Sequence, residues 1–136
     1  MQTRLSHIQF NVRPENMPFY QDLMTFLGWK TLHADEGMLG VAGAGGDSLW
    51  FVGQVKEVRN DYDGPGMNHL AIGAESQADV DATASYLRER EVELLFETPR
   101  HRPEFAADAG QIYYQVMFES PDRILLEVVY TGTKSV

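Results

Sequence analysis

The sequence predicts an α+β fold built from two βαβββ modules that share a core and enclose a cleft. Two observations predict it: the order strand, helix, three strands occurs twice, and a similar histidine-containing stretch opens each half, Ser6-His7-Ile8 and Asn68-His69-Leu70. One such module leaves a sheet face uncovered, whereas two can share a core and enclose a cleft. We therefore expect a single domain over residues 1–136, with module one at about 1–54 and module two at about 66–131.

The first module begins with a strand at residues 5–12, where apolar and polar side chains alternate. Its apolar side should pack on a helix, and its other side should face water or a ligand with His7, Gln9 and Asn11. Asn16 is a suitable N-cap for the next helix and Gly28 ends it. That helix should pack through Phe19, Leu23, Phe26 and Leu27. Three short strands are expected next, at residues 29–33, 38–42 and 48–52.

The second module follows a polar, exposed connection at residues 54–66. A strand at 67–74 places His69 on the face opposite Leu70 and Ile72. Ser76 should cap a helix whose apolar stripe is Val80, Ala84 and Leu87. Beyond it we expect a strand at 92–96, a long loop at 98–110, and a hairpin of strands at 112–119 and 124–130.

Composition excludes several classes of function. The net charge of −9 and the pI near 4.8 argue against nucleic acid or an anionic membrane as partner. No apolar run approaches the roughly 20 residues that span a bilayer, and no apolar signal-peptide core follows Met1. The chain contains no cysteine, so disulfide and thiol chemistry are absent, and a cytoplasmic location fits.

Three β-type stretches each carry one side chain that can bind a metal: His7, His69 and Glu127. A lone histidine on a strand is more often a hydrogen-bonded residue than a ligand, and Glu127 could instead pair with an arginine such as Arg4 or Arg123. The two histidines, however, occupy the same position of a repeat. Two imidazoles and one carboxylate leave about three coordination positions open for substrate. The pattern therefore favours one divalent metal held by these three residues.

The chain resembles the vicinal oxygen chelate superfamily, which includes glyoxalase I, extradiol dioxygenases, fosfomycin-resistance transferases, methylmalonyl-CoA epimerase and bleomycin-resistance proteins. The resemblance covers nearly the whole chain. It rests on the two histidine stretches, on a Phe-Tyr helix ending in Leu27-Gly28, and on Ser120-Pro121-Asp122-Arg123 running into Leu126-Glu127. It implies that the two βαβββ modules form an open mixed-sheet barrel, glyoxalase/dioxygenase-like, around the metal, and that the protein is a homodimer. Arg123 replaces a usual glycine, so the backbone could differ there, or the arginine could reach Glu119 or Asp122.

The resemblance also narrows the chemistry. Glyoxalase I-like members place a fourth ligand, a glutamate, where this chain has Trp50, so three ligands look more like the dioxygenases or fosfomycin transferases. The residues that would hold a phosphonate are not recognisable, and the intact triad argues against the bleomycin-binding role. An extradiol dioxygenase-like enzyme with Fe(II) or Mn(II) is therefore the first hypothesis, with Zn(II) or Ni(II) also open. A metal-dependent isomerase, epimerase or lyase and a small-molecule binding protein remain alternatives.

The expected substrate is a small molecule that chelates the metal through two neighbouring oxygens. Gln9 and Asn11 would orient it, and an aromatic wall would be formed by Trp50, Phe51 and Tyr114. Acid–base candidates are His101 and Tyr113. A solvated loop position is the competing reading of His101, and only one of Tyr113 and Tyr114 can face the cleft because they are neighbours on a strand.

Overall fold

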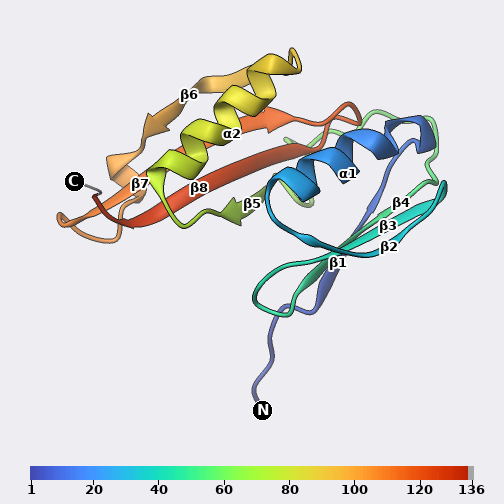
Figure 1. Cartoon of the computed structure of the whole chain (residues 1–136), viewed down its shortest axis with the longest axis horizontal. Helices are drawn as coiled ribbons and strands as arrows, with labels where there is room; N and C mark the ends of the chain where they lie inside the picture. Colours follow the sequence, from blue (N-terminus) through green and yellow to red (C-terminus); the bar gives the residue numbers. More distant parts are fainter. Residues whose placement is uncertain (135–136) are drawn as a thin grey trace. The chain divides into compact units, whose positions relative to one another are not determined.

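The computed structural model describes residues 1–134. The chain divides into two compact units, Met1–Arg59 and Asn60–Val136, each with one four-stranded sheet. In both, the order is strand, helix, three strands, with a short 3-10 helix added (Figure 1). The predicted α+β fold with two βαβββ modules is confirmed, and neither sheet closes on itself.

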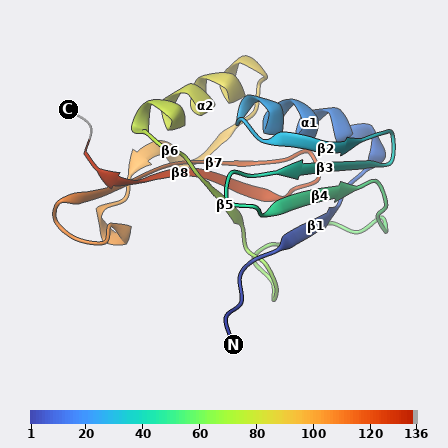
Figure 2. The same ribbon diagram turned by 60° about the horizontal axis from the view of Figure 1, so that its bottom comes forward.

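The first unit contains β1 (His7–Asn11), α1 (Met17–Phe26), β2 (Lys30–Ala34), β3 (Met38–Ala42) and β4 (Ser48–Val52), with the 3-10 helix η1 (Pro14–Asn16) before α1. The strand order is β1-β4-β3-β2. β1 runs parallel to β4, and the other pairs are antiparallel, so the first and last strands of the unit lie side by side (Figure 2).

Helix α1 covers one face of the first sheet. Tyr20 of α1 stacks on Phe51 of β4 with ring centroids 4.6 Å apart, and Phe51 stacks on Phe10 of β1 at 5.3 Å. The predicted helix stripe is only partly right: Leu23 is buried, but Phe26 is 42% exposed. Asn16 occupies the predicted N-cap position, but its side chain makes no capping hydrogen bond, and η1 leads directly into the helix.

The second unit contains β5 (Leu70–Gly73), α2 (Gln77–Glu89), β6 (Leu94–His101), β7 (Gln111–Glu119) and β8 (Leu125–Thr133), with the 3-10 helix η2 (Pro103–Phe105) after β6. The strand order is β5-β8-β7-β6, and β5 runs parallel to β8. This order repeats that of the first unit, so β5 corresponds to β1 and β8 to β4.

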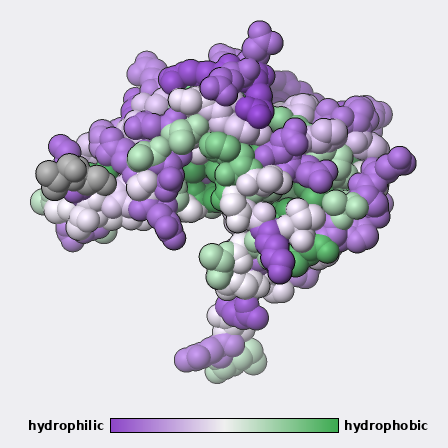
Figure 3. Space-filling view, viewed as in Figure 1, coloured by the Kyte–Doolittle hydropathy of each residue, from purple (hydrophilic) through white to green (hydrophobic). Residues whose placement is uncertain are grey.

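Helix α2 packs against β6, β7 and β8 (Figure 1). The predicted stripe of Val80, Ala84 and Leu87 is buried. The Ser76 cap is confirmed, because its hydroxyl accepts a hydrogen bond from the backbone N–H of Asp79 at 3.1 Å. The segment where α2 ends is hydrophilic, with Arg88, Glu89, Arg90 and Glu91 all exposed (Figure 3).

Two expectations about irregular segments are wrong. Residues 98–101, predicted to begin a loop, continue β6 beyond a bulge between Leu95 and Arg100. The connection at 54–66 is not exposed throughout, because Tyr62 is buried and packs with Met117 and Leu125. Within the described residues, no helix is long and apolar enough to cross a membrane.

Candidate functional site

Glu127 is a buried carboxylate that projects from the central part of the second unit's sheet. It lies on β8, paired with Ala71 of β5 and Met117 of β7, and its side chain is only 1% exposed. Its strand neighbours Leu126 and Val128 pack toward the core, so alternation turns Glu127 to the face that α2 leaves uncovered. A buried carboxylate needs polar partners, because losing water costs several kcal/mol per ion.

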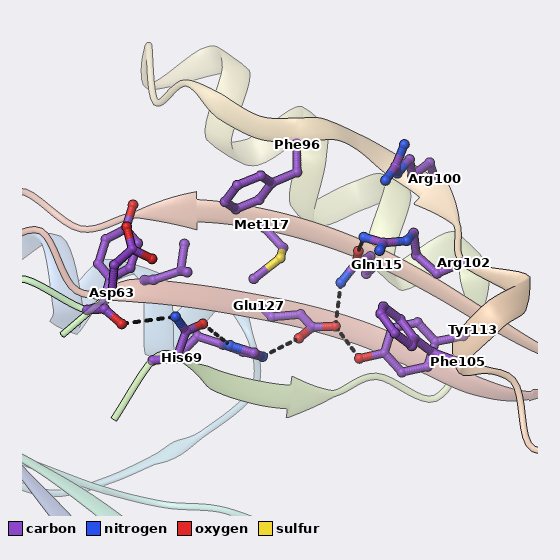
Figure 4. A pocket seen from close by; sticks show the side chains of 13 residues that line it. Asp63, His69, Phe96, Arg100, Arg102, Phe105, Tyr113, Gln115, Met117 and Glu127 are labelled. Carbon is purple, nitrogen blue, oxygen red and sulfur yellow. Dashed lines mark hydrogen bonds and ion pairs between the residues drawn. The ribbon is translucent and has the colours of Figure 1, made fainter. Parts of the chain in front are cut away.

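Both oxygens of Glu127 have such partners (Figure 4). Oε1 accepts a 2.5 Å hydrogen bond from the Tyr113 hydroxyl and a 2.7 Å hydrogen bond from Gln115 Nε2. Oε2 lies 3.1 Å from Nε2 of His69. Two donors from β7 therefore fix the plane of the carboxylate and leave Oε2 directed at the imidazole.

The orientation of His69 is set by Asn68. The Asn68 Nδ2 donates to the Tyr62 carbonyl at 2.9 Å, so its Oδ1 is the atom that faces His69 Nδ1 at 2.7 Å. A carbonyl oxygen only accepts, and Nδ1 therefore carries the proton. In the neutral ring, Nε2 then presents a lone pair to Oε2 of Glu127. Two facing lone pairs repel, so a proton or a bound metal ion must lie between Nε2 and Oε2.

The geometry of this pair fits a metal ion. Neighbouring ligand atoms of an octahedral ion, each at about 2.1 Å, lie about 3 Å apart, and the Nε2–Oε2 separation is 3.1 Å. Metal-bound histidines usually donate their other nitrogen to a hydrogen-bond acceptor, as His69 does to Asn68. Two ligands are present here; among residues 1–134, neither unit gathers three His, Asp or Glu side chains around one point.

Tyr113 supports the carboxylate as a protonated phenol. Burial and the hydrogen bond to Glu127 raise the pKa of Tyr113 well above its usual value of 10.0. It therefore remains a donor at neutral pH and does not serve as a general base. Gln115 is held in turn by Arg102, whose Nη1 donates to Gln115 Oε1 at 3.1 Å, and Arg102 Nε donates to Glu104 Oε1 at 2.6 Å.

These side chains line a pocket of about 530 Å³ on the open face of the second sheet (Figure 4). Phe96 and Phe105 form exposed apolar parts of its wall, at 51% and 54% exposure, and Met117 and Leu125 form the buried part. Arg100 and Asp63 supply charges at the rim. The volume suits a small organic molecule.

Two predicted site residues lie on the opposite face of this sheet. Tyr114 is buried toward α2 and its hydroxyl donates to Asp81 at 2.5 Å, so it does not line the pocket. His101 is its register partner and contacts its ring at 4.7 Å between centroids. Strand alternation is the reason: Arg100 and Gln115 face the pocket, so His101 and Tyr114 face away.

The remaining predicted residues belong to the first unit. Phe51 is 3% exposed and packs under α1, so its assignment to a substrate wall is wrong. His7, Gln9 and Asn11 lie on the exposed face of β1, with Gln9 Nε2 donating to Asn11 Oδ1 at 3.1 Å. Trp50 is half-buried and shares that face, because β1 and β4 pair Gln9 with Trp50.

His7 and His69 have similar local surroundings. The preceding residue contacts Nδ1 in both, Ser6 Oγ at 3.1 Å and Asn68 Oδ1 at 2.7 Å. In register, Gln9 pairs with Trp50 as Ala71 pairs with Glu127. The expected correspondence of Trp50 with the position of a metal-binding glutamate therefore follows from the strand pairing.

Sequence reasoning missed the residues that orient the site: Asn68, Arg100, Arg102 and Gln115. Gln115 could have been found, because it alternates with Tyr113 on one strand and a buried amide requires partners. Arg100 and Arg102 could not have been found in this way, because the bulge in β6 determines which face of the sheet their side chains occupy.

Comparisons with known proteins agree with this architecture. A proposed glyoxalase of Bacillus halodurans is 28% identical, superposes with a TM-score of 0.76, and the alignment covers 95% of this chain and 96% of that one. A glyoxalase/dioxygenase of Nostoc punctiforme is 16% identical with a TM-score of 0.73, covering 95% and 91% of the two chains. The predicted resemblance to the vicinal oxygen chelate superfamily is confirmed.

Further comparisons extend the range of this superfamily. The fosfomycin resistance protein FosX of Listeria monocytogenes, solved with Mn(II) and sulfate, is 18% identical with a TM-score of 0.65, over 100% of this chain and 94% of that one. No family profile matches the chain. The uncharacterised protein YqjT of Bacillus subtilis (strain 168) is 41% identical over 64 residues, 47% of this chain and 46% of that protein, so the match spans less than half of its length.

Proposed function

We propose that this chain is a cytoplasmic, metal-dependent enzyme that acts on a small substrate chelating the metal through neighbouring oxygens. One observation carries the proposal: Nε2 of His69 and Oε2 of Glu127 face each other at 3.1 Å, and both groups are held in that orientation by Asn68, Tyr113 and Gln115. Such outer hydrogen bonds are typical of metal sites.

His7 is the proposed third ligand. Its support is its position, since it stands in β1 where His69 stands before β5, and the preceding side chain likewise contacts its Nδ1. The proposed assembly is a homodimer, and His7 completes the site either within its own chain or from a second copy. Light scattering on the metal-loaded protein distinguishes the proposed homodimer from a monomer.

The proposed ion is divalent, with Fe(II) or Mn(II) first and Zn(II) or Ni(II) next. Two imidazoles and a carboxylate form the facial set typical of non-haem Fe(II) oxygenases. FosX, which shares the fold, was solved with Mn(II). The ion would polarise the substrate oxygens and stabilise negative charge that develops on them.

The residues of the pocket supply the remaining functions. Gln115 and Tyr113 hold Glu127, and the aromatic side chains Phe96 and Phe105 exclude water from one side of a bound ring. With three ligands, oxygenation of the extradiol type is the first activity to test. His101, however, is turned to the other face and Tyr113 is protonated, so neither supplies the base that ring cleavage requires.

A second candidate is a metal-dependent isomerase or lyase, in which the ion would polarise a substrate carbonyl. Tyr113 lines the pocket and stays protonated, so in this reaction too it would hold Glu127 rather than transfer a proton. Oxygen uptake separates the two candidates. With Fe(II) and a panel of catechols, an extradiol enzyme consumes oxygen, whereas an isomerase or lyase acts on its substrate without consuming any.

Metal binding tests the proposal directly. Glu127→Gln keeps the shape of the side chain and removes its charge, so we expect it to weaken Mn(II) binding by at least about 100-fold, as measured by calorimetry. Glu89→Gln makes the same change on the exposed side of α2 and should bind as the wild type does. Equal affinity in Glu127→Gln, or no metal binding by the wild type, would contradict the proposal; the latter points to a small-molecule binding protein.

A further inference from the structure

We propose that this pocket recognises a substrate that carries a carboxylate on an aromatic or branched apolar body, and that Arg100 binds the carboxylate. This inference deepens the proposed function by naming a substrate class for the same pocket. It rests on the charges and the apolar side chains of the pocket wall rather than on the metal ligands.

Arg100 is the arginine of the pocket whose charge is least engaged. Its register partner is Gln115, so it points to the pocket side of the sheet. Its Nε is buried and, among residues 1–134, has no hydrogen-bond partner. Its one ion pair joins Nη1 to Glu97 at 3.6 Å, and the Glu97 side chain is 90% exposed. An exposed pair of this kind contributes about 0–1 kcal/mol, so a ligand can replace it at little cost.

Arg102, by contrast, is already occupied. It donates to Gln115 and Glu104, and its guanidinium lies over the Phe105 ring at 4.6 Å. The bond from Arg102 also lowers the pKa of the Glu104 carboxyl. Both arginines lie near glutamates, but Arg100 makes only a long ion pair with an exposed partner, so Arg100 is the arginine left to meet an incoming carboxylate.

The distribution of charge sets the direction of the ligand. Asp63 and Arg100 lie at opposite ends of the pocket in Figure 4. Glu127 stands on β8 and Arg100 on β6, with β7 between them. Two strand spacings correspond to roughly 10 Å. A ligand whose reacting oxygens lie at Glu127 would thus extend its other end to Arg100.

The wall between these ends is apolar. Phe96 and Phe105 are half exposed, and Met117 and Leu125 are buried beneath them. Exposed phenylalanines beside a pocket are typical of a ligand surface. A planar carboxylate suits a guanidinium, because two parallel N–H bonds match its two oxygens. The Arg100 side chain is 40% exposed although its Nε is buried, so the Nη groups are the donors that such a ligand would meet.

A pair of matched probes tests this assignment. We expect the full chain to bind 3-phenylpropanoate at least about tenfold more tightly than 3-phenylpropanamide, because the two differ in charge and little else. Arg100→Gln should reduce this ratio to near one. Arg88→Gln removes an arginine from the exposed side of α2 and should preserve the ratio. Calorimetry or ligand-observed NMR, with and without added Mn(II), measures the affinities.

The outcomes separate this inference from the proposed function. A tenfold acid preference that only Arg100→Gln abolishes supports it. Equal affinities, no binding of the acid at millimolar concentrations, or a preference that survives in Arg100→Gln overturns it. Mn(II) binding by the wild type and by Arg100→Gln, measured in parallel, reports on the metal site alone. Inorganic phosphate is the third probe. If phosphate binds at Arg100 as tightly as 3-phenylpropanoate does, the apolar body contributes nothing to binding and the inference is wrong.

Discussion

The two units build the same sheet and use its open face differently. In the second unit, Glu127 of β8 pairs with Met117 of β7, and the face is hollowed into a pocket. In the first unit, the corresponding pair is Trp50 of β4 and Gly40 of β3. The indole lies directly over that glycine, since a Cβ on Gly40 would come within 2.4 Å of the ring.

This difference shows that the same sheet can carry an apolar, packed face in one unit and a hydrogen-bonded polar cluster in the other. A large side chain over a glycine fills a sheet face without any polar requirement. A carboxylate at the same position must be surrounded by donors, and Tyr113, Gln115 and His69 meet that requirement. The unit with the buried acid is therefore the one in which neighbouring residues are constrained by the hydrogen bonds that the acid requires.

The largest expected effect concerns the packed face of the first unit. Gly40→Ala should lower the free energy of unfolding by about 2 kcal/mol, because the added methyl group collides with the Trp50 ring. Urea unfolding measures this value. In the background of Trp50→Ala the same change should cost less than about 0.5 kcal/mol.

Gly73→Ala is the matched control in the second unit, where a Cβ would meet nothing within 4 Å. It should leave the free energy of unfolding within about 0.5 kcal/mol of the wild type. If both glycine substitutions cost the same, the contrast between a filled and an open face is wrong.

A smaller effect is expected for two neighbouring tyrosines on opposite faces of β7. Tyr113→Phe removes a donor to Glu127 and should weaken Mn(II) binding about tenfold, as outer hydrogen bonds of metal ligands do. Tyr114→Phe removes the bond to Asp81 and should cost about 1 kcal/mol of stability with unchanged Mn(II) affinity. Calorimetry and urea unfolding on both variants provide the readouts, and a reversed pattern would mean that the two faces have been assigned wrongly.

The last expected effect, seen only at alkaline pH, is a pH dependence of stability in the second unit. Burial and the bond to Asp81 raise the pKa of Tyr114 to about 12 from 10.0. A raised pKa means that the folded state holds the proton more tightly than the unfolded state. The stabilisation is therefore complete below pH 10 and is lost as the pH rises toward 12. Unfolding midpoints between pH 9 and 12 should fall less steeply in Tyr114→Phe; identical slopes would contradict this origin.

Much of the fold was predictable because the repeat and the strand alternation are local signals. Strand alternation alone predicted that His69 and Glu127 lie on the face opposite the helix, and Ser76 correctly indicated where α2 begins. It also required that only one of Tyr113 and Tyr114 face the pocket, and the structure selects Tyr113. The convergence of His7 with that pair stays a prediction.

The bulge in β6 was not predictable. Phe96 and Glu97 both adopt left-handed backbone conformations, with φ of 55° and 58°, which sequence patterns associate with glycine or asparagine. Arg123 is a similar case: its φ is 57°, as the glycine it replaces would favour, and its side chain reaches Glu119 at 3.7 Å as expected. Tertiary contacts hold these conformations, so a short window of sequence carries no sign of them.

The bulge in β6 shapes the rim of the pocket without involving the residues that hold Glu127. Residues 96–99 stand opposite a single residue of β7, Val116, and this excess lets both Phe96 and Arg100 border the pocket. The side chains that hold Glu127 come from β7 and from the segment before β5, on regular backbone. Insertions or deletions in this rim would change which molecules enter while the acid and its donors stay in place. Descendants of this chain could thus acquire new substrates by altering one strand edge.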